Sequence, residues 1–132
     1  MHIVKIEETF QNSINEVWDL ITNLDNQLWR SDIERIEVVD DNHFIEYDKS
    51  GYRTEFTITC KVMNEVYEFD IKNDNIEGHW IGKFKVLENQ LVHIELIESI
   101  EVKKMVMNLM AKPYIRKQQK SYIQDLKKAL QR

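Results

Sequence analysis

Apolar and polar residues alternate along most of the chain, in runs that have the length of β-strands. The clearest run is Arg53–Val62, in which Thr54, Phe56 and Ile58 share one face with Cys60 and Val62. The other runs of this kind are His2–Phe10, Ile33–Val39, Phe44–Asp48, Glu65–Ile71, Ile76–Val86 and Leu91–Val102. Short polar turns separate the runs from residue 33 onward, so the pattern predicts seven antiparallel strands with one face covered and one in water.

Helical spacing replaces this alternation after the first strand. Ser13 and Glu16 have the spacing of a capping box, and apolar residues follow on one helical face at Ile14, Val17, Trp18 and Ile21. Asp25 is placed to cap a second short helix, Asn26–Arg30, which would bring Leu28 and Trp29 beside the first helix.

The end of the chain, residues 103–132, is predicted to be one long helix. Its interrupted apolar stripe consists of Val106, Leu109, Met110, Ile123, Leu126 and Leu130. Pro113 removes a backbone donor and clashes with the carbonyl of Leu109, so we expect a kink there. The alternative is a break, with Pro113 opening a second helix.

These elements predict a single α+β domain over residues 1–132, with two short helices after the first strand and a curved seven-stranded antiparallel sheet wrapped around the C-terminal helix. Strands twist, so a long sheet cannot lie flat against a helix. It touches the helix in places and leaves space in others, and such a space is a natural binding pocket.

Charge and composition narrow the classes of function. The net charge of −5 argues against a general nucleic-acid binder. The charge is uneven, because residues 103–132 carry nine Lys or Arg and one acid, whereas residues 1–102 carry nine bases and 22 acids. A single cysteine excludes an internal disulfide framework. Neither a membrane-spanning run nor a signal peptide is evident, so we expect a cytoplasmic monomer or homodimer without integral membrane contact.

The order of elements and several residues resemble the START-like helix-grip superfamily (SRPBCC), in particular its bacterial polyketide cyclase/dehydrase-like branch. The resemblance covers nearly the whole chain and rests on Phe10, on the stretch Ser13–Asn23 with its Val17-Trp18 pair, on Trp29, and on the terminal stretch Tyr122–Leu130. It implies the helix-grip fold. It does not decide between lipid carriers, receptors and ring cyclases, because one fold hosts many functions.

Candidate ligand-binding residues come from the covered face of the predicted sheet and from the helix. Trp80 stands between Gly78 and Gly82 on one strand face, where the glycines leave room beside the indole and let the sheet bend. The other candidates on the strands are Phe56, Ile58, Tyr67, Phe69 and Glu98; those on the helix are Met105, Met110 and Gln119. For Trp80, core packing is an equal alternative. Gln119 falls on the inward stripe of the helix, and the alternative for this residue is that it is exposed at the edge of the helix.

Glu98 continues the apolar phase of Val92, Ile94 and Leu96, so a regular strand would point its carboxylate into the cavity. Burial would raise its pKa and suit it to acid–base chemistry, which makes it a weak catalytic candidate. The alternative is a β-bulge at Leu96-Ile97 that turns Glu98 outward. Glu46, between Ile45 and Tyr47, poses the same question.

Other reactive residues give no such signal. Cys60 lies in the apolar phase of its strand and is expected to be a small buried hydrophobe. The four histidines are scattered, and no metal site and no cofactor are expected.

The sequence therefore favours binding, with possible transport or sequestration, of a small hydrophobic or aromatic ligand between sheet and helix. One alternative is a polyketide cyclase- or dehydratase-like enzyme that uses an inward carboxylate. Another is an interaction module whose basic C-terminal helix contacts a partner through residues Arg116–Lys120.

Overall fold

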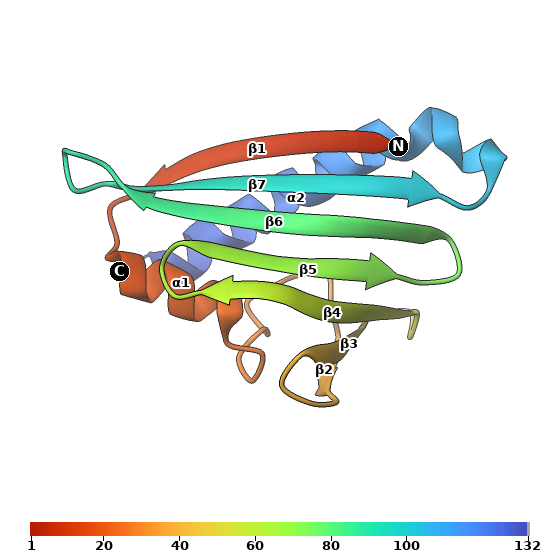
Figure 1. Cartoon of the computed structure of the whole chain (residues 1–132), viewed down its shortest axis with the longest axis horizontal. Coiled ribbons are helices and arrows are strands. Elements are labelled where there is room, and N and C mark those ends of the chain that lie inside the picture. The colour runs from red at the N-terminus through yellow and green to blue at the C-terminus, as the bar shows by residue number, and fades with distance from the viewer. Residues whose placement is uncertain (132) are drawn as a thin grey trace.

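The computed structural model describes residues 1–131 (Figure 1). In chain order the elements are β1 (His2–Phe10), α1 (Ile14–Thr22), β2 (Arg35–Val38), β3 (His43–Tyr47), β4 (Arg53–Val62), β5 (Val66–Lys72), β6 (Ile76–Val86), β7 (Val92–Val102), a 3-10 turn (Met105–Met107) and α2 (Asn108–Leu130). The strands form one antiparallel sheet in the order β1-β7-β6-β5-β4-β3-β2. The predicted seven-stranded sheet and long C-terminal helix are therefore confirmed.

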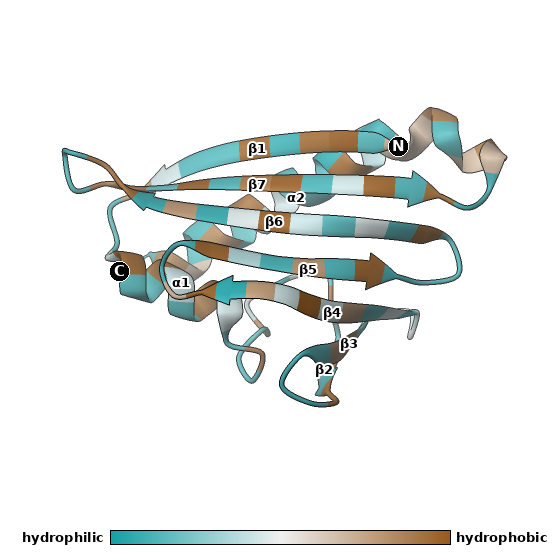
Figure 2. Ribbon diagram, in the orientation of Figure 1, coloured by the Kyte–Doolittle hydropathy of each residue, from teal (hydrophilic) through white to brown (hydrophobic). Residues whose placement is uncertain are grey.

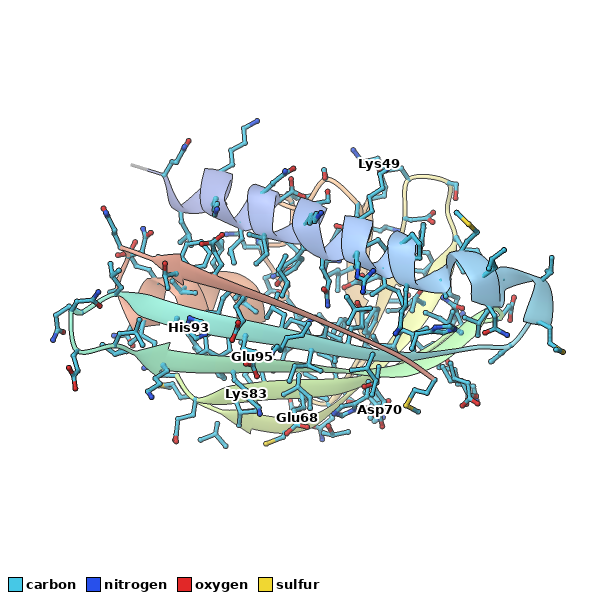
Figure 3. All side chains as sticks on the ribbon, turned by 90° about the horizontal axis from the view of Figure 1, so that it is seen from above. Lys49, Glu68, Asp70, Lys83, His93 and Glu95 are labelled. Atoms are coloured by element: carbon cyan, nitrogen blue, oxygen red, sulfur yellow. The ribbon has the colours of Figure 1, made fainter. Side chains whose placement is uncertain are left out.

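The sheet curves, and α2 lies along its concave side (Figures 1 and 3). Teal and brown positions alternate along the strands, which is the pattern of a sheet with one covered face (Figure 2). The buried side chains of that face include Ile94, Leu96, Tyr67 and Phe84, and α2 adds Ile115, Ile123 and Leu126. This packing forms a single hydrophobic core between sheet and helix.

One row of residues across the sheet fixes the position of the later site. Strand pairing places Glu98 of β7 between Val4 of β1 and Trp80 of β6, and Trp80 in turn pairs with Phe69 of β5. The pairing of β7 with β6 is continuous from Val92 to Val102. No bulge interrupts it at Leu96-Ile97, so Glu98 stays on the same face as Leu96.

A register shift occurs in β4 instead, between Ile58 and Cys60. Because one extra residue reverses the side-chain alternation, Cys60 pairs with Glu68 and leaves the apolar face. The expectation that Cys60 is a buried core residue is wrong: it is partly exposed, and burial together with the Glu68 carboxylate raises the pKa of its thiol.

Helix α1 begins as predicted, with the Ser13 hydroxyl accepting a hydrogen bond from the backbone N–H of Glu16 at 3.2 Å. The prediction of a second short helix over Asn26–Arg30 is wrong, because residues 23–34 form turns and Leu28 is 83% exposed. The buried Gln27 side chain donates instead to the carbonyls of Leu20 and Asn23, which satisfies the end of α1 and holds the turn beneath it.

Helix α2 runs without a break through Pro113. Its first residue is Asn108, so the helical region starts five residues later than predicted, after the 3-10 turn. The alternative in which Pro113 opens a separate helix does not hold, because Pro113 lies inside α2.

Candidate functional site

Two adjoining cavities lie between the concave face of the sheet and α2. The inner cavity, of about 180 Å³, extends from the end of α1 to Trp80 and Tyr122. The outer cavity, of about 790 Å³, lies between the far ends of the strands and the first turns of α2. The residues that line both are Asp32, Glu46, Thr54, Glu98 and Gln118. A mainly polar boundary thus separates two spaces with more apolar walls, and the outer volume is within the range of small-molecule sites.

Stacked aromatic rings form the floor of the inner cavity. Phe69 and Trp80 stack at 4.7 Å between ring centroids, and Phe44 and Phe56 stack at 4.8 Å. The Trp80 indole lies over Gly82, where an added Cβ would come within 2.8 Å of the ring. Glycine at this position is therefore needed for the observed orientation of Trp80.

Arg30 brings a paired charge into the inner cavity. Its guanidinium donates to the Glu46 carboxylate at 2.7 and 3.1 Å and to the Asp32 carboxylate at 2.8 and 3.1 Å. It also lies 5.6 Å from the centre of the Tyr122 ring. Burial alone would lower the pKa of Arg30, but the two carboxylates outweigh burial and hold that pKa well above its usual range. Arg30 therefore remains protonated on the cavity wall, and its positive charge is balanced by the carboxylates of Glu46 and Asp32.

Glu98 is the unpaired acid of the site. Its side chain is partly buried, and it lines both cavities. Within residues 1–131, no group donates a hydrogen bond to its carboxylate. Burial and then the negative charge of Glu46 raise the pKa of Glu98 to about 7, although Arg30 acts in the opposite direction. A group of this kind changes its protonation near neutral pH and beside open space.

Two phenol groups face the same space. The Tyr67 hydroxyl is buried and has no hydrogen-bond partner in the described chain, and Tyr67 is only 2% exposed. Burial raises the pKa of Tyr67 to about 12, and burial also raises the pKa of Tyr122 well above its usual range. Both phenols are therefore neutral and can exchange hydrogen bonds with a ligand.

The outer cavity opens beside an apolar surface. Val106, Met110 and Tyr114 line the cavity and are also largely exposed. Leu109, on the same turns of α2, is 87% exposed. These side chains form an apolar rim at the mouth of the cavity.

The structure brings most of the predicted site residues together. Phe56, Tyr67, Phe69, Trp80, Glu98 and Gln119 line the inner cavity, and Met110 lines the outer one. Ile58 packs against the core and lines neither cavity. Met105 is 88% exposed and also lies outside both linings, because the 3-10 turn carries it away from the sheet.

Gln119 points inward, but it has a structural partner. Its buried side-chain amide donates to the backbone carbonyl of Val4 at 2.9 Å. This bond ties α2 to β1 in the row that contains Glu98. One of the two N–H donors of the amide thus holds the helix, and the predicted ligand-orienting role would fall to the second N–H and the amide oxygen.

Sequence reasoning missed Arg30, Asp32 and Tyr122 as members of the site. Arg30 and Asp32 lie in irregular turns, where no periodicity indicates which way a side chain faces. Tyr122 directly precedes Ile123, which belongs to the predicted apolar stripe of the helix. A wider stripe that included Tyr122 would have placed it on the inward face. The sequence left open whether the Glu46 side chain faces the cavity or solvent. In the structure it lines both cavities and forms an ion pair with Arg30.

The opposite face of the sheet carries a separate network of charges (Figure 3). His79 contacts Asp70 at 2.6 Å and Glu68 at 2.9 Å, and Glu95 contacts Lys5 at 3.6 Å. The labelled side chains Glu68, Asp70 and Glu95 lie on the face of the sheet that is turned away from α2 (Figure 3). Within residues 1–131 there is no cluster of three His, Cys, Asp or Glu side chains placed to bind a metal ion.

No protein-family model matches the sequence, and no curated protein matches it. Solved structures do match. A conserved protein from Geobacillus kaustophilus superposes with a TM-score of 0.82 at 10% identity, covering 97% of this chain and 94% of that one. A START superfamily protein from Mycobacterium smegmatis gives 0.75 at 13% identity, covering 98% and 94%. The chain has the START-like helix-grip fold. That is the fold which the sequence resemblance implied.

The helix-grip fold is shared with a further protein, the di-domain ARO/CYC BexL from the BE-7585A biosynthetic pathway. It superposes with a TM-score of 0.79 at 8% identity, covering 96% of this chain and 45% of that chain. In the described residues of the present helix-grip chain, no helix is both long and apolar enough to span a bilayer.

Proposed function

We propose that this protein binds a small, largely apolar or aromatic molecule in the inner and outer cavities. The observation that carries the proposal is the pair of adjoining spaces, of about 180 and 790 Å³, walled by aromatic rings on one side and by apolar residues of β7 and α2 on the other. Burial of apolar ligand surface would supply the affinity, at roughly 25 cal/mol per Å² before the cost of association.

The names of two structurally similar proteins support the proposal. One is called a START superfamily protein and the other an ARO/CYC from a biosynthetic pathway. Both share the helix-grip fold in which a ligand would lie between sheet and helix. The buried Tyr67 hydroxyl and the unpaired Glu98 would orient such a ligand, because a buried polar group gains stability from a hydrogen-bond partner.

A cavity-filling substitution tests the proposal. Ala111 is buried and lines the outer cavity, so Ala111→Phe places a ring in the proposed ligand space. Ala129→Phe adds the same ring at an exposed position of α2 and serves as the control. The neutral dye N-phenyl-1-naphthylamine reports binding through its fluorescence, and we expect Ala111→Phe to weaken it by at least about tenfold.

Circular dichroism establishes that the filled variant folds, and Val102→Trp, at a second lining position, provides an independent filling substitution. Native mass spectrometry of protein purified from cells should show a bound mass in the unmodified chain and less of it in both filled variants. Equal dye binding by the unmodified chain, the filled variants and the control would contradict the proposal.

A second candidate function is proton-transfer catalysis on the bound molecule, of the cyclase or dehydratase kind. The observation that favours it is the inward carboxylate of Glu98, whose pKa of about 7 suits general acid–base chemistry near neutral pH. Molecules that co-purify with the unmodified chain and with Glu98→Gln distinguish the two functions. An enzyme would hold substrate in the variant and product, or nothing, in the unmodified chain. A binding protein would hold the same mass in both.

A further inference from the structure

The walls of the two cavities carry an excess of negative charge. Their acidic side chains are Asp32, Glu46, Asp48 and Glu98, and Arg30 is the one basic side chain in the described linings. Arg30 is fully engaged by Glu46 and Asp32, so it offers no free positive charge to a ligand. An anionic ligand would therefore meet uncompensated repulsion, whereas a cation would meet attraction.

The unpaired polar groups of the cavity are also suited to a cation. Asp48 already accepts hydrogen bonds from Ser50 and Tyr52, which leaves Glu98 as the acid without a partner. The Tyr67 oxygen is unpartnered as well, and it lies in the wall of the inner cavity with Glu98. A carboxylate and a phenol oxygen can both accept from the N–H groups of an ammonium.

Aromatic faces complete this environment. Trp80 pairs directly with Glu98 across the sheet, and the Tyr122 ring lies 6.4 Å from the Trp80 ring. Tyr122 already has the Arg30 guanidinium over its ring, at 5.6 Å. Aromatic rings attract cations through their quadrupole, most strongly where water is excluded.

We propose that the ligand of the two cavities is a primary or secondary amine with an apolar or aromatic body, bound as the ammonium with Glu98 as its counter-ion. This inference rests on the proposed binding function and names the chemical class of the ligand. The ammonium would lie beside Glu98 at the polar boundary between the cavities, and the body would extend into the outer cavity.

Binding of an ammonium would be coupled to proton release. The pKa of Glu98 is about 7 without ligand, so below that pH the carboxyl must first lose its proton to solvent. The titratable or charged groups that line the cavities with Glu98 are Arg30, Asp32, Glu46, Asp48, Tyr52, Tyr67, Tyr114 and Tyr122. Burial raises the pKa values of Tyr67 and Tyr122, so both stay neutral, and Arg30 remains charged; Glu98 should therefore dominate the pH dependence.

Three matched probes test the inference: 2-(2-naphthyl)ethylamine, 2-(2-naphthyl)ethanol and 3-(2-naphthyl)propanoate. They share one aromatic body and differ in the terminal group. By isothermal titration calorimetry at about pH 8, we expect the amine to bind at least about tenfold more tightly than the alcohol, and the carboxylate most weakly. The amine should lose about fivefold in affinity between pH 7 and pH 6, because Glu98 is then mostly protonated.

Glu98→Gln keeps the size of the side chain and removes its charge, so it should abolish the amine preference while the alcohol still binds. Glu95→Gln is the matched control, because Glu95 lies on the same strand but on the outer face (Figure 3). It should leave the preference unchanged.

The inference is overturned if the alcohol or the carboxylate binds as tightly as the amine at about pH 8, or if Glu98→Gln leaves the preference intact. In either case the proposed apolar binding site still stands, because a probe has bound. If no probe binds, including the neutral dye, the proposed function fails together with the inference. A ligand that weakens above the pKa of Glu98 would indicate a protonated Glu98 donating to an acceptor, which also overturns the amine assignment.

Discussion

The two ends of α2 differ in what they contact. From Ile115 to Leu130 the helix buries one stripe against the sheet, with Leu126 fully buried. From Asn108 to Tyr114 only Ala111 is buried, and apolar side chains such as Leu109 face solvent. The same helix therefore closes one end of the concave sheet and leaves the other end open.

The change occurs at one row of the sheet. Gln119 of α2 is hydrogen-bonded to Val4, and Val4 pairs with Glu98. Ile94 and Leu96, which precede Glu98 along β7, are almost completely buried beneath the helix. At the row itself, Glu98 lines the inner cavity. A close-packed end thus anchors the helix, and the anchored helix holds the other end away from the sheet. The cavity depends on this division of α2.

The largest expected effect separates the two ends directly. Leu126→Ala leaves a cavity in the packed end and should lower the free energy of unfolding by about 3 kcal/mol. Leu109→Ala removes the same atoms from an exposed position and should change it by less than about 0.5 kcal/mol. Urea denaturation followed by circular dichroism measures both. Similar losses in the two variants would show that the open end is also packed in solution.

A smaller effect is expected at the row where the two ends meet. The raised pKa of Glu98 means that the folded protein holds this proton more tightly than the unfolded chain does. The contribution of Glu98 to stability is therefore most favourable below the ordinary pKa of 4.5 and becomes less favourable as the pH rises through about 7. Glu98→Gln removes this penalty. At about pH 8 it should be more stable than the wild type by roughly 2 kcal/mol, after allowance for water in the cavity.

The measurement is the free energy of unfolding of both proteins at several pH values from about 4 to 8. The difference between them should grow through the interval in which the unfolded chain ionises and the folded protein does not, and then level off. A difference that does not vary with pH would mean that Glu98 has an ordinary pKa and contacts bulk water.

The smallest expected effect concerns the bond that anchors α2. Gln119→Leu leaves the Val4 carbonyl without this donor and should cost about 1 kcal/mol of stability. Gln124→Leu, at an exposed position of the same helix, is the control. Hydrogen exchange of the β1 amides around Val4 should rise in the first variant only. Unchanged stability and exchange would indicate that packing alone sets the position of α2.

The sheet could be predicted because the alternation of apolar and polar residues along a strand indicates which face of the sheet each side chain occupies. Glu98 is the clearest case: its phase in β7 placed it on the covered face, and the continuous pairing with β6 keeps it there. The same logic failed for Cys60, because the register shift between Ile58 and Cys60 is set by pairing with β5 and not by the local pattern.

The irregular segment between α1 and β2 could not be predicted. A helical pattern around Leu28 competes there with the need of α1 for hydrogen-bond donors at its end, and the Gln27 side chain meets that need. The resulting turn is what directs Arg30 toward Glu46. The charged part of the site thus depends on tertiary contacts that no spacing in the sequence encodes.

The glycine beneath Trp80 has a practical consequence for anyone who wishes to redesign this protein. The orientation of the indole is set by a missing atom, since a methyl group at position 82 would overlap the ring. Gly82→Ala would therefore displace the indole and reshape the inner cavity from its floor. A smaller residue at position 80 would instead remove the ring itself, which offers a second route to a differently shaped cavity on the same scaffold.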